Sequence, residues 1–140
     1  MGTRGLYIFR YKNKWYVFYN HFDSYPEGLG ESIVAELKTI DWEEAKRLIE
    51  AIGEADVNSP DGSCKCKGLM DALTQPSDYV LEAILEHAPD SRAFDWEYAY
   101  TINLDANTFE VRYYSDATES ENTQRFQLDA VPANWATYIV

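Results

Sequence analysis

The sequence predicts an α+β protein in which an antiparallel sheet packs against helices. Two segments rich in aromatic and β-branched residues, 6–11 and 15–19, flank the polar turn 12–14, a pattern typical of a β-hairpin. A second hairpin is expected near the C-terminus, and apolar residues at helical spacing dominate between the two. This order predicts a two-layer sandwich with about three helices on one face of the sheet.

The N-terminal hairpin carries apolar residues on both of its faces. Alternation places Tyr7 and Phe9 on one face of its first strand and Leu6 and Ile8 on the other. The hairpin is therefore expected inside the sheet or under a second layer. Were one of its aromatic faces exposed, it would form a docking surface, so a homodimer through this hairpin is one predicted arrangement.

Three helices are predicted after this hairpin. The first begins near Glu31, and the second follows a capping box of Asp41 and Glu44. Gly53 is expected to end the second helix, and Ser77 to cap the third. The apolar face of the third helix consists of Val80, Ala83, Ile84 and His87.

Beyond residue 53, and apart from the third helix, the sequence predicts loops, strands and a C-terminal tail. Residues 54–67 lack periodicity and predict a flexible loop. The C-terminal hairpin pairs strands 96–104 and 109–114, after which 115–123 is a polar surface loop and 125–128 a short strand. The aromatic tail is expected to dock on the core; it contains Pro132, Trp135, Tyr138 and Ile139. A length of 140 residues suits one domain over 1–140.

Composition and charge narrow the class of protein. The chain is 46% hydrophobic and contains no long uncharged apolar stretch, so a folded protein without a membrane span is expected. The net charge is −12, with +4 in residues 1–20 and −16 in the rest of the chain, and this acidic body argues against nucleic-acid binding over most of the surface. Cys64 and Cys66 are expected to be reduced thiols, and no secretory signal is recognisable, so the predicted location is intracellular, cytoplasmic or nuclear.

The turn between the first hairpin and the first helix is the most distinctive stretch. Residues 20–30 read N-H-F-D-S-Y-P-E-G-L-G. A purely architectural interpretation explains all of it: Asp23 caps the turn, Tyr25 fills the core, and Gly28 and Gly30 adopt positive φ before the helix. This interpretation requires no ligand.

This turn also carries a resemblance. Together with Gly-Thr-Arg-Gly at 2–5, the H-F-D-S-Y-P-E-G-L-G stretch resembles the N-terminal signature of a family of uncharacterised proteins from fungi and large DNA viruses. It is similar, more remotely, to small phage proteins with an H-W-D-G-Y-P turn, from which this chain departs at Phe22 and Ser24. The resemblance covers about the first quarter of the chain and implies kinship without implying an activity.

The leading functional hypothesis is a non-enzymatic ligand-binding or protein-interaction module. Glycines at a helix start expose N–H donors, Arg4 offers a bidentate fork, and His21 adds a titratable donor. The partner would be a protein or a small anionic ligand, although Glu27 and Glu31 would repel an anion. The predicted binding residues are Arg4, His21, Asp23, Tyr25, Gly28 and Gly30. No cofactor is expected.

Two alternatives belong to other functional classes. The first is a small hydrolase, with His21 and Asp23 as an oriented pair and Thr3 as a candidate nucleophile that would need a free N-terminal amine. The second is an acidic inhibitor that imitates nucleic acid, which requires carboxylates in a ribbon at phosphate spacing. No metal site is predicted, because nothing in the spacing brings His21 and His87 together.

Overall fold

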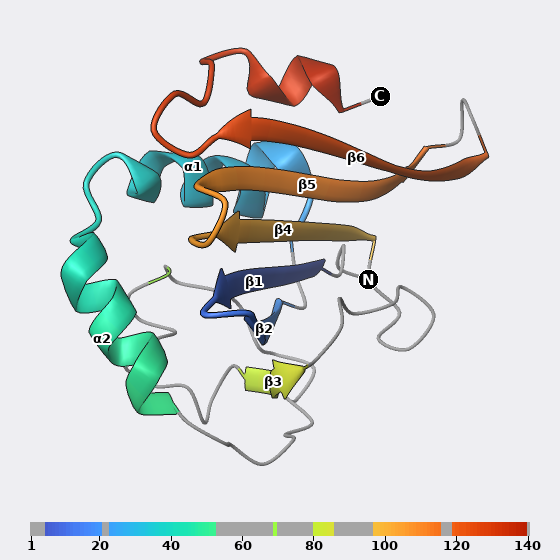
Figure 1. Ribbon diagram of the computed structural model, residues 1–140. Coiled ribbons are helices and arrows are strands. Elements are labelled where there is room, and N and C mark those ends of the chain that lie inside the picture. Colours follow the sequence, from blue (N-terminus) through green and yellow to red (C-terminus); the bar gives the residue numbers. More distant parts are fainter. Residues whose placement is uncertain are drawn as a thin grey trace.

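A six-stranded sheet with helices packed against one face forms the fold (Figure 1). The computed structural model describes residues 5–20, 23–52, 69, 80–85, 97–115 and 119–139. The strands are β1 Gly5–Tyr11, β2 Lys14–Asn20, β3 Val80–Leu85, β4 Tyr98–Asn103, β5 Thr108–Ser115 and β6 Ser120–Gln127. The helices are a π-helical turn η1 Pro26–Gly30, α1 Glu31–Leu37, α2 Trp42–Ile52 and a 3₁₀ helix η2 Trp135–Tyr138. The predicted α+β class is confirmed.

The sheet is mixed, which corrects the predicted antiparallel sheet. Its order is β3-β2-β1-β4-β5-β6, and every neighbouring pair is antiparallel except β1 and β4. Both predicted hairpins form in register, with Tyr7 opposite Phe18 in the first and Thr101 opposite Glu110 in the second. The parallel pairing places the two hairpins side by side at the centre of the sheet, where β1 lies against β4.

Two expectations about the secondary structure were wrong. The segment predicted as the core of a third helix is strand β3, which pairs with the outer edge of β2. A strand can satisfy its backbone groups on that open edge, and this outweighed the helical spacing of the apolar residues. The loop predicted over 115–123 is also shorter than expected, because β6 already begins at Ser120 and pairs with β5 along its whole length.

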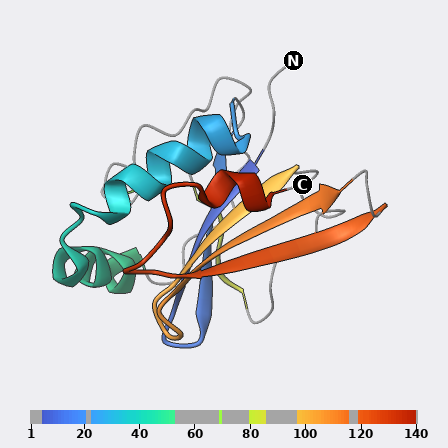
Figure 2. The same cartoon turned by 90° about the horizontal axis from the view of Figure 1, so that it is seen from above.

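The core lies between the sheet and the helices, as Figure 2 shows from above. Tyr7 and Phe9 of β1 face it, while Leu6 and Ile8 lie on the opposite face, and all four side chains are fully buried. This confirms that the first hairpin lies within the sheet. The aromatic side chains that the structure describes on this hairpin therefore do not offer the exposed face that a homodimer would use there.

The helices begin where the sequence predicts. Asp41 Oδ1 accepts hydrogen bonds from the backbone N–H groups of Glu43 and Glu44, at 3.1 and 3.2 Å, which confirms it as the cap of α2. The other half of the predicted capping box differs, because the Glu44 carboxylate pairs with Arg47 on the next turn. The tail docks as expected, since Trp135 is buried and meets the Phe109 ring edge-on at 5.7 Å between centroids.

Some predictions fall outside the described residues. These are the loop at 54–67, the end of α2 at Gly53, and two residues of the predicted third helix, its cap Ser77 and His87 of its apolar face. Among the residues that are described, no helix has the length and hydrophobicity needed to cross a membrane.

Candidate functional site

The turn after the first hairpin is a corner built against the sheet. Ser24 is fully buried, and its hydroxyl accepts a hydrogen bond from Asn20 Nδ2 at 2.8 Å. The buried Tyr100 hydroxyl donates to the Ser24 carbonyl oxygen at 2.7 Å. Burial raises the pKa of Tyr100 well above its usual value, with smaller contributions from Tyr98 and Glu27, so this hydroxyl remains a donor. These bonds fix the chain where it leaves β2.

The glycines of the corner serve close packing. Gly30 has right-handed helical angles (φ −58°), and Asp23 is the residue with a positive φ, 55°. A Cβ on Gly28 would lie 2.2 Å from the Asp23 carbonyl oxygen, and one on Gly30 would lie 2.5 Å from the Trp135 ring. The expectation of positive φ at these glycines was therefore wrong: the left-handed residue is the aspartate, which tolerates that region better than most.

Backbone carbonyl oxygens of the corner accept bonds from its own N–H groups. The Gly28 N–H donates to the Tyr25 carbonyl oxygen at 2.9 Å, and the Leu29 N–H donates to the Asp23 carbonyl oxygen at 2.8 Å. Gly30 is buried between the rings of Tyr100 and Trp135. An anion at this helix start would therefore compete with internal bonds at Gly28, which weakens the chemical reason for placing one there.

The corner also carries exposed side chains. Tyr25 is 38% exposed, so it does not fill the core as the architectural interpretation expected. Its hydroxyl lies 3.4 Å from Asp23 Oδ1, and the structure thus brings together two of the predicted site residues. Glu27 and Glu31 are exposed on the same corner. The described part of the site is an exposed tyrosine with acidic neighbours.

The other predicted site residues lie outside the described part of the chain. They are Thr3, Arg4 and His21. The hydrolase alternative depends on His21 and therefore stays a prediction. The acidic-inhibitor alternative also stays a prediction. Five of the described carboxylates pair with basic side chains: Glu44, Glu50, Asp105, Glu110 and Glu121.

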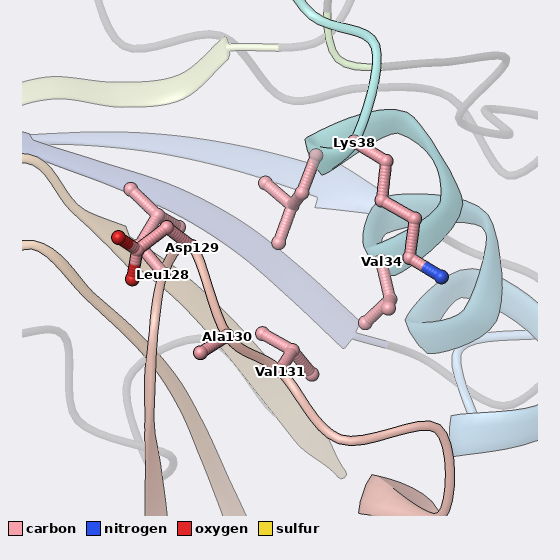
Figure 3. Close-up of a pocket in the computed structure, with 7 residues that line it drawn as sticks. Val34, Lys38, Leu128, Asp129, Ala130 and Val131 are labelled. Atoms are coloured by element: carbon pink, nitrogen blue, oxygen red, sulfur yellow. The ribbon is translucent and has the colours of Figure 1, made fainter.

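A small cavity lies between the end of α1 and the chain after β6 (Figure 3). Its volume is about 110 Å³, and Val34, Leu37, Leu128, Ala130 and Val131 supply apolar walls. Lys38 and Asp129 complete the lining, and Figure 3 shows their charged ends directed away from each other. The cavity is small beside ordinary ligand sites and lacks convergent polar groups, so we do not assign chemistry to it.

Two groups of hydrogen bonds and ion pairs around the first hairpin were not predicted from the sequence. The Asp105 carboxylate accepts hydrogen bonds at 2.8 Å from the backbone N–H groups of both Lys12 and Asn13. Glu50 of α2 pairs with the Lys12 ammonium and accepts from the Tyr11 hydroxyl at 3.2 Å. The hydrogen bond from Lys12 lowers the pKa of Glu50. An acid directly after a strand was the available signal for Asp105, but its partners lie far away in the sequence.

The described residues contain no cluster of three or more histidine, cysteine, aspartate or glutamate side chains that could hold a metal ion. Comparison with protein-family models, with curated proteins and with solved structures finds no match to this chain. The resemblance to the fungal and viral family therefore stays a prediction.

Proposed function

We propose that this chain is a non-enzymatic binding module and that the corner at 23–31 is its site. The supporting observation is a contrast in burial: Ser24, Pro26 and Leu29 are buried, whereas Tyr25 between them is 38% exposed. A tyrosine on an immobilised backbone loses little conformational entropy when a partner covers it. Tyrosine is also among the residues most often found at the energetic centre of protein interfaces.

The charges of the corner favour a protein partner over a small anion. The Asp23 carboxylate lies beside the Tyr25 hydroxyl, and the exposed Glu27 and Glu31 follow on the same turn, so a phosphate or carboxylate ligand would meet negative charge. An arginine or lysine of a partner can stack on the Tyr25 ring while it pairs with the Asp23 carboxylate. We therefore propose a protein segment that presents a basic side chain, with Arg4 and His21 as further contacts.

The proposal is tested by titrating the isotope-labelled chain and following its backbone amide resonances. The probes are a short arginine-containing peptide and inorganic phosphate. We expect the peptide to shift resonances of residues 23–31, and Tyr25→Ala and Asp23→Asn each to weaken this binding about fivefold or more. Tyr138→Ala is the control, because Tyr138 is 47% exposed and lies outside the corner. Peptide shifts that persist in both corner variants, or are absent from the natural chain, would contradict the proposal.

A further inference from the structure

The outer edge of β6 is one border of the described sheet. β6 is the last strand of the sheet, paired with β5 on one side, and no strand of the described residues pairs with its other side (Figure 1). It is eight residues long and contains no proline, the residue that commonly blocks such edges. Backbone N–H and C=O groups along an edge of this length can form a ladder with another strand.

The charged side chains of β6 lie on one face of the sheet. Glu121 pairs with Arg112 of β5, at 2.7 Å between Oε1 and the guanidinium, and Arg125 pairs with Glu110, at 3.3 Å. Arg112 donates two hydrogen bonds to Glu121, and Oε1 accepts both of them. The Arg125 side chain is 68% exposed. Each charge therefore has capacity left for a further partner on the open side.

The spacing of these two charges makes the strand self-complementary. In an antiparallel pair of identical strands related by a two-fold axis at Thr123, Glu121 stands opposite Arg125 of the second copy, and Arg125 opposite its Glu121. Directly opposite residues share a face of the sheet, as Glu121 and Arg125 do. Across the dimer, Arg112 and Glu121 of one copy would be followed by Arg125 and Glu110 of the other. Neighbouring charges in this row have opposite signs throughout.

We propose that β6 pairs with β6 of a second copy of this chain, in this register, to form one continuous sheet across a dimer. Shifting the axis to Glu121 places two glutamates opposite each other, and shifting it to Arg125 does the same with two arginines, so both registers are disfavoured. The strand itself is neutral, since Glu121 and Arg125 cancel, within a chain of net charge −12. The edge is thus a place where two acidic chains meet without local repulsion.

Sedimentation velocity on the full chain, over a wide range of concentrations, tests the dimer. We expect a monomer–dimer equilibrium in the natural chain. Glu121→Arg and Arg125→Glu, each alone, place like charges opposite each other and should weaken dimerisation about tenfold or more. Thermal melting of each variant checks that it is folded.

An equimolar mixture of the two variants is the decisive measurement. In Glu121→Arg both of these strand positions are basic, and in Arg125→Glu both are acidic. Every opposing pair in the mixed dimer therefore joins unlike charges, so association should return while each variant alone remains monomeric. Loss of folding cannot produce this rescue. Glu119→Arg is the matched control, because in the proposed register it faces the uncharged Gln127 and should leave dimerisation unchanged.

A natural chain that stays monomeric at the highest concentration overturns the proposal. Variants that dimerise as the natural chain does also overturn it, because the interface then lies elsewhere. If Glu119→Arg breaks the dimer and Glu121→Arg does not, the register is wrong. A monomer whose β6 amides respond to an extended peptide instead would identify the edge as a peptide-binding site and reject the second copy as occupant.

Discussion

A methyl group added at Gly28 should lower the stability of the fold strongly. Its missing Cβ leaves room for the Asp23 carbonyl oxygen, which would otherwise be 2.2 Å away. Alanine is the better helix former by about 1 kcal/mol, but overpacking against fixed backbone typically costs about 1–3 kcal/mol and sometimes more. We expect Gly28→Ala to lower the free energy of unfolding by about 2–3 kcal/mol in urea denaturation.

Two comparisons make this prediction specific. Gly30→Ala should lower the free energy of unfolding by less. Its Cβ would meet the far end of the Trp135 side chain, which can shift more easily than the backbone beside Gly28. Glu27→Ala changes an exposed side chain of the same turn and should stay within about 0.5 kcal/mol of the natural chain. If Gly28→Ala unfolds at the same urea concentration as the natural chain, the contact with Asp23 is not the reason for this glycine.

The Tyr100 hydroxyl gives the corner a dependence on alkaline pH. Burial raises its pKa, so its contribution to stability is complete below the unfolded-state pKa of about 10 and is lost as pH rises further, at up to about 1.4 kcal/mol per pH unit. Tyr100→Phe should cost about 1–3 kcal/mol at neutral pH, because the Ser24 carbonyl oxygen loses its donor. Urea denaturation between pH 9 and 11 should then show a shallower decline for Tyr100→Phe. Equal slopes would refute the buried-donor role.

The residues of the corner show what sequence can and cannot predict at this scale. The location of a fixed turn was readable from its proline, glycines and aspartate. The role of each residue was not, because the close approaches of Gly28 to Asp23 and of Gly30 to Trp135 depend on tertiary packing. Asp23 takes the left-handed conformation that was expected of the glycines. The composition of the segment predicts a turn, and tertiary packing decides which of its residues adopts the left-handed conformation.

Among the elements, the turn of the first hairpin depends on a residue of the second. Lys12 and Asn13 both have positive φ, a conformation that suits a tight hairpin and costs non-glycine residues energy. The two carboxylate oxygens of Asp105 each accept one of their N–H groups. An asparagine offers only one acceptor oxygen, so Asp105→Asn should destabilise almost as much as Asp105→Ala, by about 1–2 kcal/mol after allowance for exposure.

The control for Asp105 is Asp129→Asn, a similar change in the exposed segment after β6. It should alter the midpoint of thermal unfolding very little. If Asp105→Asn is equally neutral, the Asp105 carboxylate does not stabilise the turn of the first hairpin. Amide hydrogen exchange at Lys12 and Asn13 provides a direct readout, since both amides should exchange faster once the carboxylate is gone.

The elements that could be predicted are those encoded by local signals. The hairpins have polar turns between alternating segments, and α2 has Asp41 as its cap. Strand β3 and the parallel pairing of β1 with β4 have no such signal. Spacing within Val80–Leu85 suits a helix, and only the presence of an open β2 edge makes it a strand. Parallel partners far apart in sequence are likewise fixed by the assembled core.

At the scale of the whole molecule, β1 joins the two ends of the described chain into one sheet. It pairs with β2 on one side and with β4 on the other. Tyr7 and Phe9 share their core with Tyr100 and Phe109 of the C-terminal hairpin. If either hairpin unfolded alone, the buried side chains of the other would be exposed to water. We therefore expect a single cooperative unfolding transition, as is usual for domains of this size.

The tryptophans make this last prediction measurable. Trp15 lies in β2, Trp42 at the start of α2 and Trp135 in η2, and the fourth tryptophan, Trp96, lies outside the described residues. Tryptophan fluorescence therefore includes signals from three separate described elements, while far-UV circular dichroism reports on the whole backbone. The two transitions in urea should coincide, and they should still coincide in Trp42→Phe, which removes the signal of α2. A fluorescence midpoint that moves away from the dichroism midpoint in this variant would mean that α2 unfolds separately. The sheet and helices would then be two cooperative units, because a shared core requires one midpoint for every probe.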